Sequence, residues 1–171
     1  MYQTAVKKLS RYLVRKSVFF LPAERQIAIE RRHRGREQYA KLREADVTIV
    51  SHGKSGRTWL RVMLSRVYQV RHGLPEGALL SYDNLHRRNP AVPVVFFTHD
   101  NYVRDYTGSA DVRSDYGDRK LVLLVRHPAD VAVSQFFQWK FRMKSHKKDI
   151  NAFPPDGADV PIFDFLLNPQ W

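Results

Sequence analysis

The sequence predicts an α/β fold, with an open parallel sheet and flanking helices preceded by a helical N-terminal segment. Three short apolar runs carry this prediction, and they cover Val47–Val50, Pro93–Phe97 and Leu121–Val125. Each run is apolar throughout rather than alternating, which is typical of strands covered on both faces in a parallel sheet. Segments long enough for helices separate the runs, and strands that alternate with helices indicate βαβ units.

The N-terminal segment, residues 1–46, is basic and helical in character. Residues 2–16 place apolar side chains at helical spacing among lysines and arginines, and the composition of Ala23–Glu44 favours a longer helix. The segment carries +7 of the net charge of +12. We interpret its basic cluster, Arg31–Arg36, as a solvated helix face, because charge runs usually are. A nucleic-acid patch there, and contact of residues 2–21 with a membrane surface, stay open as alternatives.

The remaining residues, 47–171, are expected to form the α/β domain. Helical patterns over Thr58–Val70 and Ala129–Met143 follow the first and third strands. Between the second and third strands, Asp100–Arg119 is polar and is predicted to be mainly loop, with room for a short helix. Ser145–Pro161 contains adjacent prolines and a glycine and is predicted to be irregular. The aromatic side chains of the predicted helix Ala129–Met143 are expected to serve in packing: Phe136, Phe137, Trp139 and Phe141.

Length and composition exclude several classes of protein. A chain of 171 residues is enough for one domain, and 43% hydrophobic residues is ordinary for a globular protein. The chain has no cysteine, which excludes disulfides, thiolate metal sites and cysteine nucleophiles. Dense apolar runs such as Val18–Leu21 are far shorter than a membrane-spanning helix, and no secretory signal is visible, so we expect a cytoplasmic protein. The net charge favours anionic partners.

Cationic and proton-accepting residues follow all three predicted strands. They lie in Ser51–Trp59, Thr98–Asp100 and Arg126–Pro128. The carboxyl ends of parallel strands meet at one edge of a sheet, here called the rim, and ligands of open α/β sheets bind beyond it. We therefore expect these three segments to form one site.

The first of these segments has the features of a phosphate-binding loop. Gly53 and Gly56 allow a tight turn whose backbone N–H groups converge, and a predicted helix begins directly after it. Lys54 adds a positive charge. The loop is not a Walker A motif, because Thr48 stands where that motif needs a glycine. For this loop alone, a plain polar turn stays open as the alternative.

The run Lys54-Ser-Gly-Arg-Thr-Trp59 resembles the 5′-phosphosulfate loop of the sulfotransferases that use 3′-phosphoadenosine 5′-phosphosulfate (PAPS). That loop commonly reads Pro-Lys-Ser-Gly-Thr-Thr-Trp. Arg126 and Ser134 are similar to the 3′-phosphate motif of this family, and His99 stands where the family keeps its catalytic histidine. The resemblance runs from about Val47 to Arg142, and more loosely to Leu167.

The resemblance implies a P-loop-like fold of the sulfotransferase type and a role for each of these residues. The residues implied to bind PAPS, and its product adenosine 3′,5′-bisphosphate (PAP), are Lys54, Ser55, Gly56, Arg57, Thr58, Trp59, Arg126 and Ser134. Lys54 would contact the bridging oxygen of the phosphosulfate, and Trp59 would lie against the adenine. Arg126 and Ser134 would hold the 3′-phosphate. His99 is implied to be the general base, a role that suits an imidazole near neutral pH.

Three departures from the family pattern bear on this expectation. Gly53 replaces the usual proline of the loop, and Arg57 replaces a threonine, which exchanges a hydroxyl donor for a cation. Residues 145–171 contain nothing like the Arg-Lys-Gly loop with which the family completes its 3′-phosphate site. We therefore expect residues 47–171 to be the nucleotide-binding part of a domain that is truncated on its C-terminal side, and the activity of this part alone stays an open question.

The sequence thus predicts a sulfotransferase that moves a sulfuryl group from PAPS to a hydroxyl or amine of a small-molecule, glycan or lipid acceptor, with no metal and no nucleic acid. By analogy with phosphoryl transfer, Lys54 would stabilise the charge on the leaving phosphate. A P-loop kinase or NTPase, and a non-catalytic basic protein that binds nucleic acid or anionic membranes, stay open as alternatives.

Overall fold

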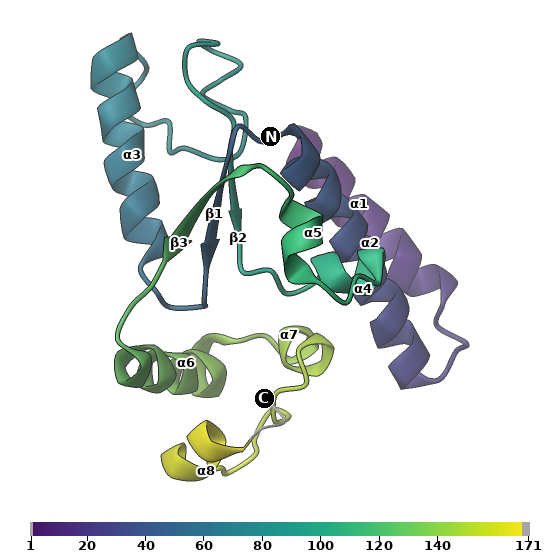
Figure 1. The fold of residues 1–171 in the computed structure, drawn as a ribbon. Helices are drawn as coiled ribbons and strands as arrows, with labels where there is room; N and C mark the ends of the chain where they lie inside the picture. Colours follow the sequence, from purple (N-terminus) through teal and green to yellow (C-terminus); the bar gives the residue numbers. More distant parts are fainter. Residues whose placement is uncertain (1, 169–171) are drawn as a thin grey trace.

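A three-stranded parallel sheet forms the centre of the computed structural model, which describes residues 2–168 (Figure 1). Its strands are β1 (Val47–Ser51), β2 (Val95–Thr98) and β3 (Lys120–Leu124), in the order β2-β1-β3. The β-branched and aromatic runs of the sequence therefore form the strands that the apolar pattern predicted, to within two residues at each end. The open α/β fold with a parallel sheet is confirmed.

The register of the sheet brings the three strand ends to one rim. Val50, near the end of the central strand, pairs with Thr98 of β2 on one side and with Leu123 of β3 on the other. Since all three strands run in the same direction, His99 follows β2 on one side of the β1 loop and Arg126 follows β3 on the other. The order of the strands thus determines the order of the candidate residues along the rim: His99, then the β1 loop, then Arg126.

Helices cover both faces of this sheet and extend below its rim (Figure 1). The helices described are α1 (Tyr2–Ser17), α2 (Ala23–Glu44), α3 (Arg57–His72), α4 (Val103–Thr107), α5 (Val112–Tyr116), α6 (Pro128–Arg142), α7 (Ser145–Ile150) and α8 (Ile162–Leu167). α3 lies on one face of the sheet, whereas α2, α4 and α5 lie on the other. No helix in the described part of the chain has both the length and the apolar character that crossing a bilayer requires.

Two hydrophobic clusters fix the sheet between these layers. On the α2 side, Leu42 packs with Phe96 and Val103, and on the α3 side Ile49 packs with Leu80 and Val95. Burial of this kind stabilises a fold by roughly 25 cal/mol for each Å² of apolar surface removed from water. The two faces of β1 are therefore both buried, as its non-alternating sequence predicted.

A third cluster lies below the rim, between α6 and α8. Trp139 and Phe136 of α6 are buried against Phe165, and the indole Nε1–H of Trp139 donates to the Pro154 carbonyl at 2.8 Å. The predicted packing role of α6 aromatics is confirmed for these two residues. Phe137 and Phe141, by contrast, are exposed on the other side of the helix.

The expected irregular stretch Ser145–Pro161 begins with a helix, so that prediction is wrong over α7. Its sequence, Ser-His-Lys-Lys-Asp-Ile, has no apolar periodicity from which a helix could be predicted. Tertiary contacts hold it instead, because Lys148 is buried against the Trp139 ring and forms an ion pair with Asp156 at 2.5 Å. The polar stretch Asp100–Arg119 likewise contains two short helices rather than mainly loop.

The interpretation of Arg31–Arg36 as a solvated helix face is wrong for two of its four arginines. Arg31 and Arg34 face the body of the protein and pair with carboxylates, while Arg32 and Arg36 are exposed. Gly35 is buried, and a Cβ atom added to it would collide with the carbonyl oxygen of Tyr102. α2 therefore packs against the start of α4 at a distance that only glycine allows.

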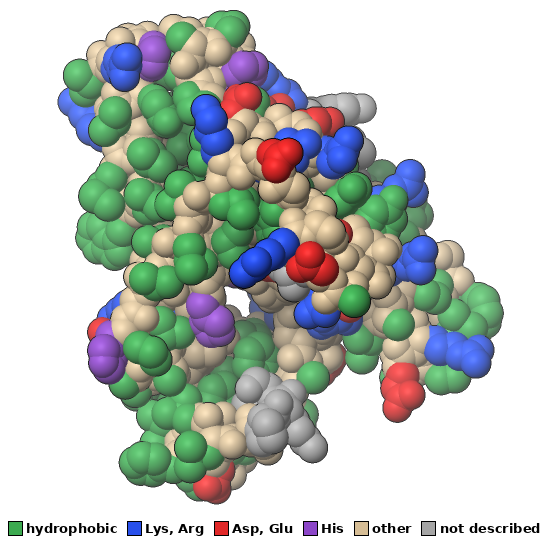
Figure 2. Space-filling view, in the orientation of Figure 1, with side chains coloured by type: hydrophobic (Ala, Val, Ile, Leu, Met, Phe, Trp, Pro, Cys, Tyr) green, Lys and Arg blue, Asp and Glu red, His purple; other side chains and the backbone are tan. Residues whose placement is uncertain are grey.

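Apolar side chains also remain on the surface, mainly over α3 and β3 (Figure 2). Val62, Val67 and Val70 are exposed along α3, and Leu123 is 70% exposed on β3. The strand β3 is an edge of the sheet, and its side chains are exposed along most of its length. The β3 side of the protein is therefore much less covered than the β2 side, and the expectation that the third strand is covered on both faces is wrong.

Candidate active site

The loop between β1 and α3 turns through two left-handed residues. Lys54 has φ 68° and Gly56 has φ 94°. A left-handed conformation is unstrained for glycine but unfavourable for lysine, and strain of this kind gathers at functional sites. Ser55, between the two, is buried, and its N–H donates to the His52 carbonyl at 3.4 Å.

This loop leaves the start of α3 open toward the rim. Gly56 is the residue that precedes the first turn of the helix, and no side chain caps that turn. The first N–H groups of an α-helix have no partner within the helix and carry its positive dipole end. An uncapped N-terminus of a 16-residue helix at a strand–helix junction is a suitable anion-binding site.

Arg126 lies directly against this loop, so the structure brings together the ends of β1 and β3. Its Nη1–H donates to the carbonyl oxygen of Lys54 at 3.3 Å, and its Nε–H donates to Asp130 at 3.4 Å. The ammonium of Lys54 donates to Oε1 of Gln138 on α6 at 3.2 Å. Both cations thus lie at the same edge, where the sequence predicted a shared site.

His99 is positioned at the end of β2 by the neighbouring strand. Its Nδ1 lies 2.7 Å from the carbonyl oxygen of Ser51. Because a carbonyl oxygen only accepts hydrogen bonds, Nδ1 carries the proton and the lone pair of the neutral ring is on Nε2. Burial lowers the pKa of His99, and the charges of Arg57, His52 and Lys147 lower it further, against the raising effect of the Ser51 hydrogen bond. His99 is therefore neutral at neutral pH, with a basic nitrogen available.

The rim carries more positive charge than its own carboxylates balance. Arg57 is partly buried, and burial followed by repulsion from Arg61 lowers its pKa. In the described part of the chain, no ion pair joins either Arg57 or Lys54 to a carboxylate. A buried or half-buried charge is costly unless it is paired. An anionic ligand would supply the missing partner.

The other residues that the sequence pointed to lie around these groups. Thr58 and Trp59 are exposed in the first turn of α3, where Trp59 is 75% exposed and its ring is accessible. Ser134 is partly buried on the second turn of α6. His52 and His127 are exposed, and neither is brought into contact with His99 by a hydrogen bond among the described residues.

Two α6 residues at the loop were missed by the sequence analysis. Gln138 bonds Lys54, and a Cβ atom added to Gly53 would lie 3.1 Å from Oε1 of Gln135. Gly53, in place of the usual proline, therefore lets α6 approach the loop closely. The signal was present in the sequence, since Gln135 and Gln138 follow Ser134 at spacings that place all three near one face of a helix.

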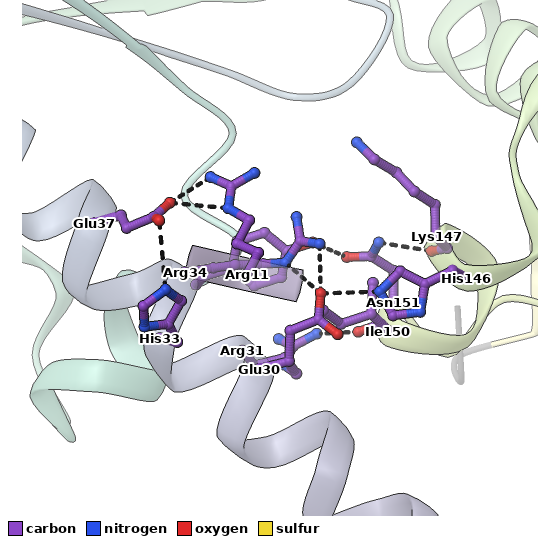
Figure 3. Close-up of polar contacts among 11 residues, drawn as sticks. Arg11, Glu30, Arg31, His33, Arg34, Glu37, His146, Lys147, Ile150 and Asn151 are labelled. Atoms are coloured by element: carbon purple, nitrogen blue, oxygen red, sulfur yellow. Dashed lines mark hydrogen bonds and ion pairs between the residues drawn. The ribbon is translucent and has the colours of Figure 1, made fainter. Parts of the chain in front are cut away.

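A network of ion pairs holds α7 beside the site (Figure 3). Glu30 of α2 is buried and accepts hydrogen bonds from Arg34 at 2.5 Å and from His146 of α7 at 2.9 Å. Glu37, one turn further along α2 from Arg34, pairs with Arg11 of α1. The basic N-terminal segment is thus joined to α7 through Glu30.

A hollow of about 490 Å³ lies over β3, away from the α3 N-terminus. Val50, Leu121 and Leu123 line it, together with Asp100 and Tyr116. Burial raises the pKa of Asp100 and also that of the Tyr116 phenol. Asp100 therefore holds its proton more readily than an exposed aspartate.

The chain was compared with protein families, curated proteins and solved structures. The model of a family described as "Sulfotransferase domain" matches residues 44–156. No curated protein matches the chain, and no solved structure matches it. Within the described residues, no three histidine, aspartate or glutamate side chains lie together as a metal site. The matched region contains the β1 loop, His99 and Arg126, and it covers well over half of the chain, which therefore belongs to the sulfotransferase domain family.

Proposed function

We propose that this protein transfers a sulfuryl group from PAPS to a hydroxyl or amine of an acceptor. The observation that carries the proposal is the hydrogen bond between Arg126 and the Lys54 carbonyl. It places a guanidinium beside a loop that ends at an uncapped helix N-terminus. Two anion-binding groups from different strand ends at one edge suit a ligand with two separate phosphates.

The proposed donor site divides between the two strand ends. The backbone N–H groups after Gly56, with the hydroxyls of Ser55 and Thr58, would hold the 5′-phosphate, and Arg57 would add a cation. Arg126 and Ser134 would hold the 3′-phosphate, because the planar guanidinium fork matches a phosphate better than an ammonium does. Trp59 offers an exposed ring for the adenine.

The charges of the rim support a donor of this kind. Arg57 has no carboxylate partner among the described residues, and the ammonium of Lys54 has only the neutral amide of Gln138. PAPS supplies the activated sulfuryl group, and PAP is the leaving group. A dianionic phosphate and a phosphosulfate would satisfy the cations that the protein itself leaves unpaired.

His99 and Lys54 would act on opposite sides of the transferred group. Nε2 of His99 is available to accept the proton of an acceptor hydroxyl while the acceptor oxygen bonds to sulfur. The bond from sulfur to the phosphate oxygen breaks at the same time, and Lys54 would stabilise the negative charge that develops on that oxygen. The proton ends on His99, and the electron pair of the broken bond ends on PAP.

The test is the dependence of nucleotide binding on the 3′-phosphate. We expect the protein to bind PAP at least about tenfold more tightly than adenosine 5′-monophosphate, since hydrogen bonds to charged groups contribute about 1.5–3 kcal/mol. Isothermal titration calorimetry on the full chain measures both affinities. Arg126→Gln should remove this preference, whereas Arg142→Gln, at the exposed far end of α6, should keep it.

Equal affinity of the wild-type chain for the two nucleotides would refute the proposal. ATP hydrolysis that depends on magnesium would favour a kinase or NTPase in its place. Binding of nucleic acid or anionic vesicles without any nucleotide requirement would favour a basic binding protein.

A further inference from the structure

α7 is anchored at both of its ends to elements that surround His99. His146 bonds the buried carboxylate of Glu30 at 2.9 Å, and Arg31 donates to the Ile150 carbonyl at 2.8 Å (Figure 3). The Tyr102 hydroxyl donates to Asn151, directly after the helix, at 2.9 Å. These contacts come from α2 and from the start of α4, so they hold α7 against two elements of the protein body.

The same contacts place α7 on the β2 side of the rim. Arg31, which bonds the end of α7, also donates to the carbonyl oxygen of Asn101, two residues after His99. β2 and β3 lie on opposite sides of β1, so α7 and Arg126 lie on opposite sides of the loop. In the proposed reaction the donor phosphates lie toward Arg126, and the acceptor therefore approaches His99 from the side of α7.

Lys147 is the residue of α7 that is free to bind a ligand there. Figure 3 shows its side chain extending away from the helix, and its ammonium has no carboxylate partner among the described residues. Burial lowers the pKa of Lys147, and the charges of Arg34, Arg11 and Arg57 lower it further. Lys147 lies on the His99 side of the rim, because Arg31 joins the end of its helix to Asn101, two residues after His99. In keeping with this placement, the charge of Lys147 lowers the pKa of His99.

The carboxylates of α2 and α4 on the α7 side already have partners. Glu30 is held by Arg34 and His146, and Glu37 by Arg11 and His33. Asp105 is held by Arg31 at 3.0 Å. The charges that act on Lys147 are those of Arg34, Arg11 and Arg57, and a field of this sign attracts anions.

We propose that the acceptor carries an anionic group, a carboxylate or a sulfate, next to the hydroxyl or amine that is sulfated, and that Lys147 binds this group. This inference rests on the proposed function, because the acceptor side is defined by His99. Neutral phenols and alcohols would be poor acceptors, and acidic hydroxy compounds good ones. Lys147 orients the acceptor and takes no part in the proton transfer.

A pair of matched phenols tests the proposal and does not require the natural acceptor to be identified. 4-Hydroxyphenylacetate and 4-hydroxyphenylethanol carry the same phenol. The side chain of the first ends in a carboxylate, and that of the second ends in an alcohol. With PAP bound at saturation, we expect calorimetry to show at least about tenfold tighter binding of the carboxylate, in keeping with one charge-assisted hydrogen bond. Lys147→Gln should reduce this preference to near unity and leave the affinity for PAP unchanged.

Lys144→Gln is the matched control, since Lys144 is an exposed lysine that precedes the same helix. It should keep the preference. Equal binding of the two probes by the wild-type PAP complex, or a preference that survives in Lys147→Gln, would overturn the inference. A loss of PAP affinity in Lys147→Gln would also overturn the inference, because such a loss would assign Lys147 to the donor site. Failure of PAP to bind the wild-type chain would refute the proposed function instead, so the two failures are distinguishable.

Discussion

The two outer strands end at the same rim but in different surroundings. Three of the four residues of β2 are buried, and α2 and α4 cover that side. β3 is exposed along most of its length, and the Arg126 side chain that follows it is 45% exposed. His99 is thus held by a 2.7 Å hydrogen bond in a packed region, whereas Arg126 is held by contacts of 3.3 and 3.4 Å at the surface.

This difference suits the two roles that we propose. A general base works when its reacting nitrogen is held in one orientation and one tautomer, which the Ser51 carbonyl and the packed surroundings provide. An arginine that binds an incoming phosphate must exchange its present partners for the ligand. Because the hydrogen bonds of Arg126 are long and its side chain is exposed, that exchange costs little free energy.

The largest expected effect separates the two sides by function. His99→Ala should reduce the rate of sulfuryl transfer by roughly 10²–10⁴-fold, because general acid–base catalysis contributes that much. Its affinity for PAP should stay within about twofold of wild type, since His99 lies on the side of the loop away from Arg126. Arg126→Gln should have the opposite pattern, with its main effect on the affinity for PAP rather than on the rate of transfer. Mass-spectrometric assay of transfer and calorimetry of PAP binding measure the two. A parallel loss of both in His99→Ala would reassign His99 to structure.

The next effect tests how tightly the β2 side is packed. Gly35→Ala should lower the free energy of unfolding by about 2 kcal/mol, because overpacking costs more than the helix propensity of alanine returns. The new Cβ would collide with the Tyr102 carbonyl oxygen and would lie 2.8 Å from the Tyr106 Cβ. Gly77→Ala is the control, because a Cβ there meets nothing within 4 Å. Urea denaturation should show no destabilisation for Gly77→Ala, and equal stability of the two variants would contradict the close α2–α4 contact.

A smaller effect concerns the ion pairs of α2. Glu30→Gln should cost about 1–3 kcal/mol, because it leaves the poorly exposed Arg34 without its anion. Glu76→Gln, in an exposed pair with Arg66, should cost less than about 0.5 kcal/mol.

The pH dependence of the Glu30 contribution has a defined sign. Burial raises the pKa of Glu30, but the hydrogen bonds from Arg34 and His146 outweigh it and bring the pKa below its usual 4.5. The stabilisation is therefore present above pH 4.5 and is lost as the pH falls through the lowered pKa. Denaturation at neutral and acidic pH should show the difference between wild type and Glu30→Gln shrinking in acid. A difference that grows in acid would contradict the assignment.

The smallest effect is a shift in a pH profile. The pKa of His99 lies below its usual 6.5, so the acidic limb of kcat/KM should have its midpoint below pH 6.5. Activity is lost as the pH falls through this value, because the protonated ring cannot accept a proton. Measuring the PAP affinity over the same range removes any contribution from donor binding. A midpoint above pH 7 would show that another group, or a His99 in more polar surroundings, sets the profile.

The sequence by itself determined the sheet, the loop and the order of the candidate site. Apolar runs without alternation occur where both faces of a strand are buried, and a glycine-rich turn before a helix presents N–H groups in any fold. Parallel strands then bring their following residues to one edge. For these reasons the chain order alone places Lys54, His99 and Arg126 at one rim.

Only the tertiary structure decided the environment of that rim. α7 has no sequence periodicity and is held by two contacts with α2, which lies more than 100 residues earlier: His146 bonds Glu30, and Arg31 bonds the Ile150 carbonyl. The basic run Arg31–Arg36 of α2 does not indicate which of its arginines face the protein interior. The charge pattern alone does not reveal which elements pack against α2. The unpaired charge of Lys147, and with it the proposed selection of an anionic acceptor, depends on carboxylates that other residues had already taken.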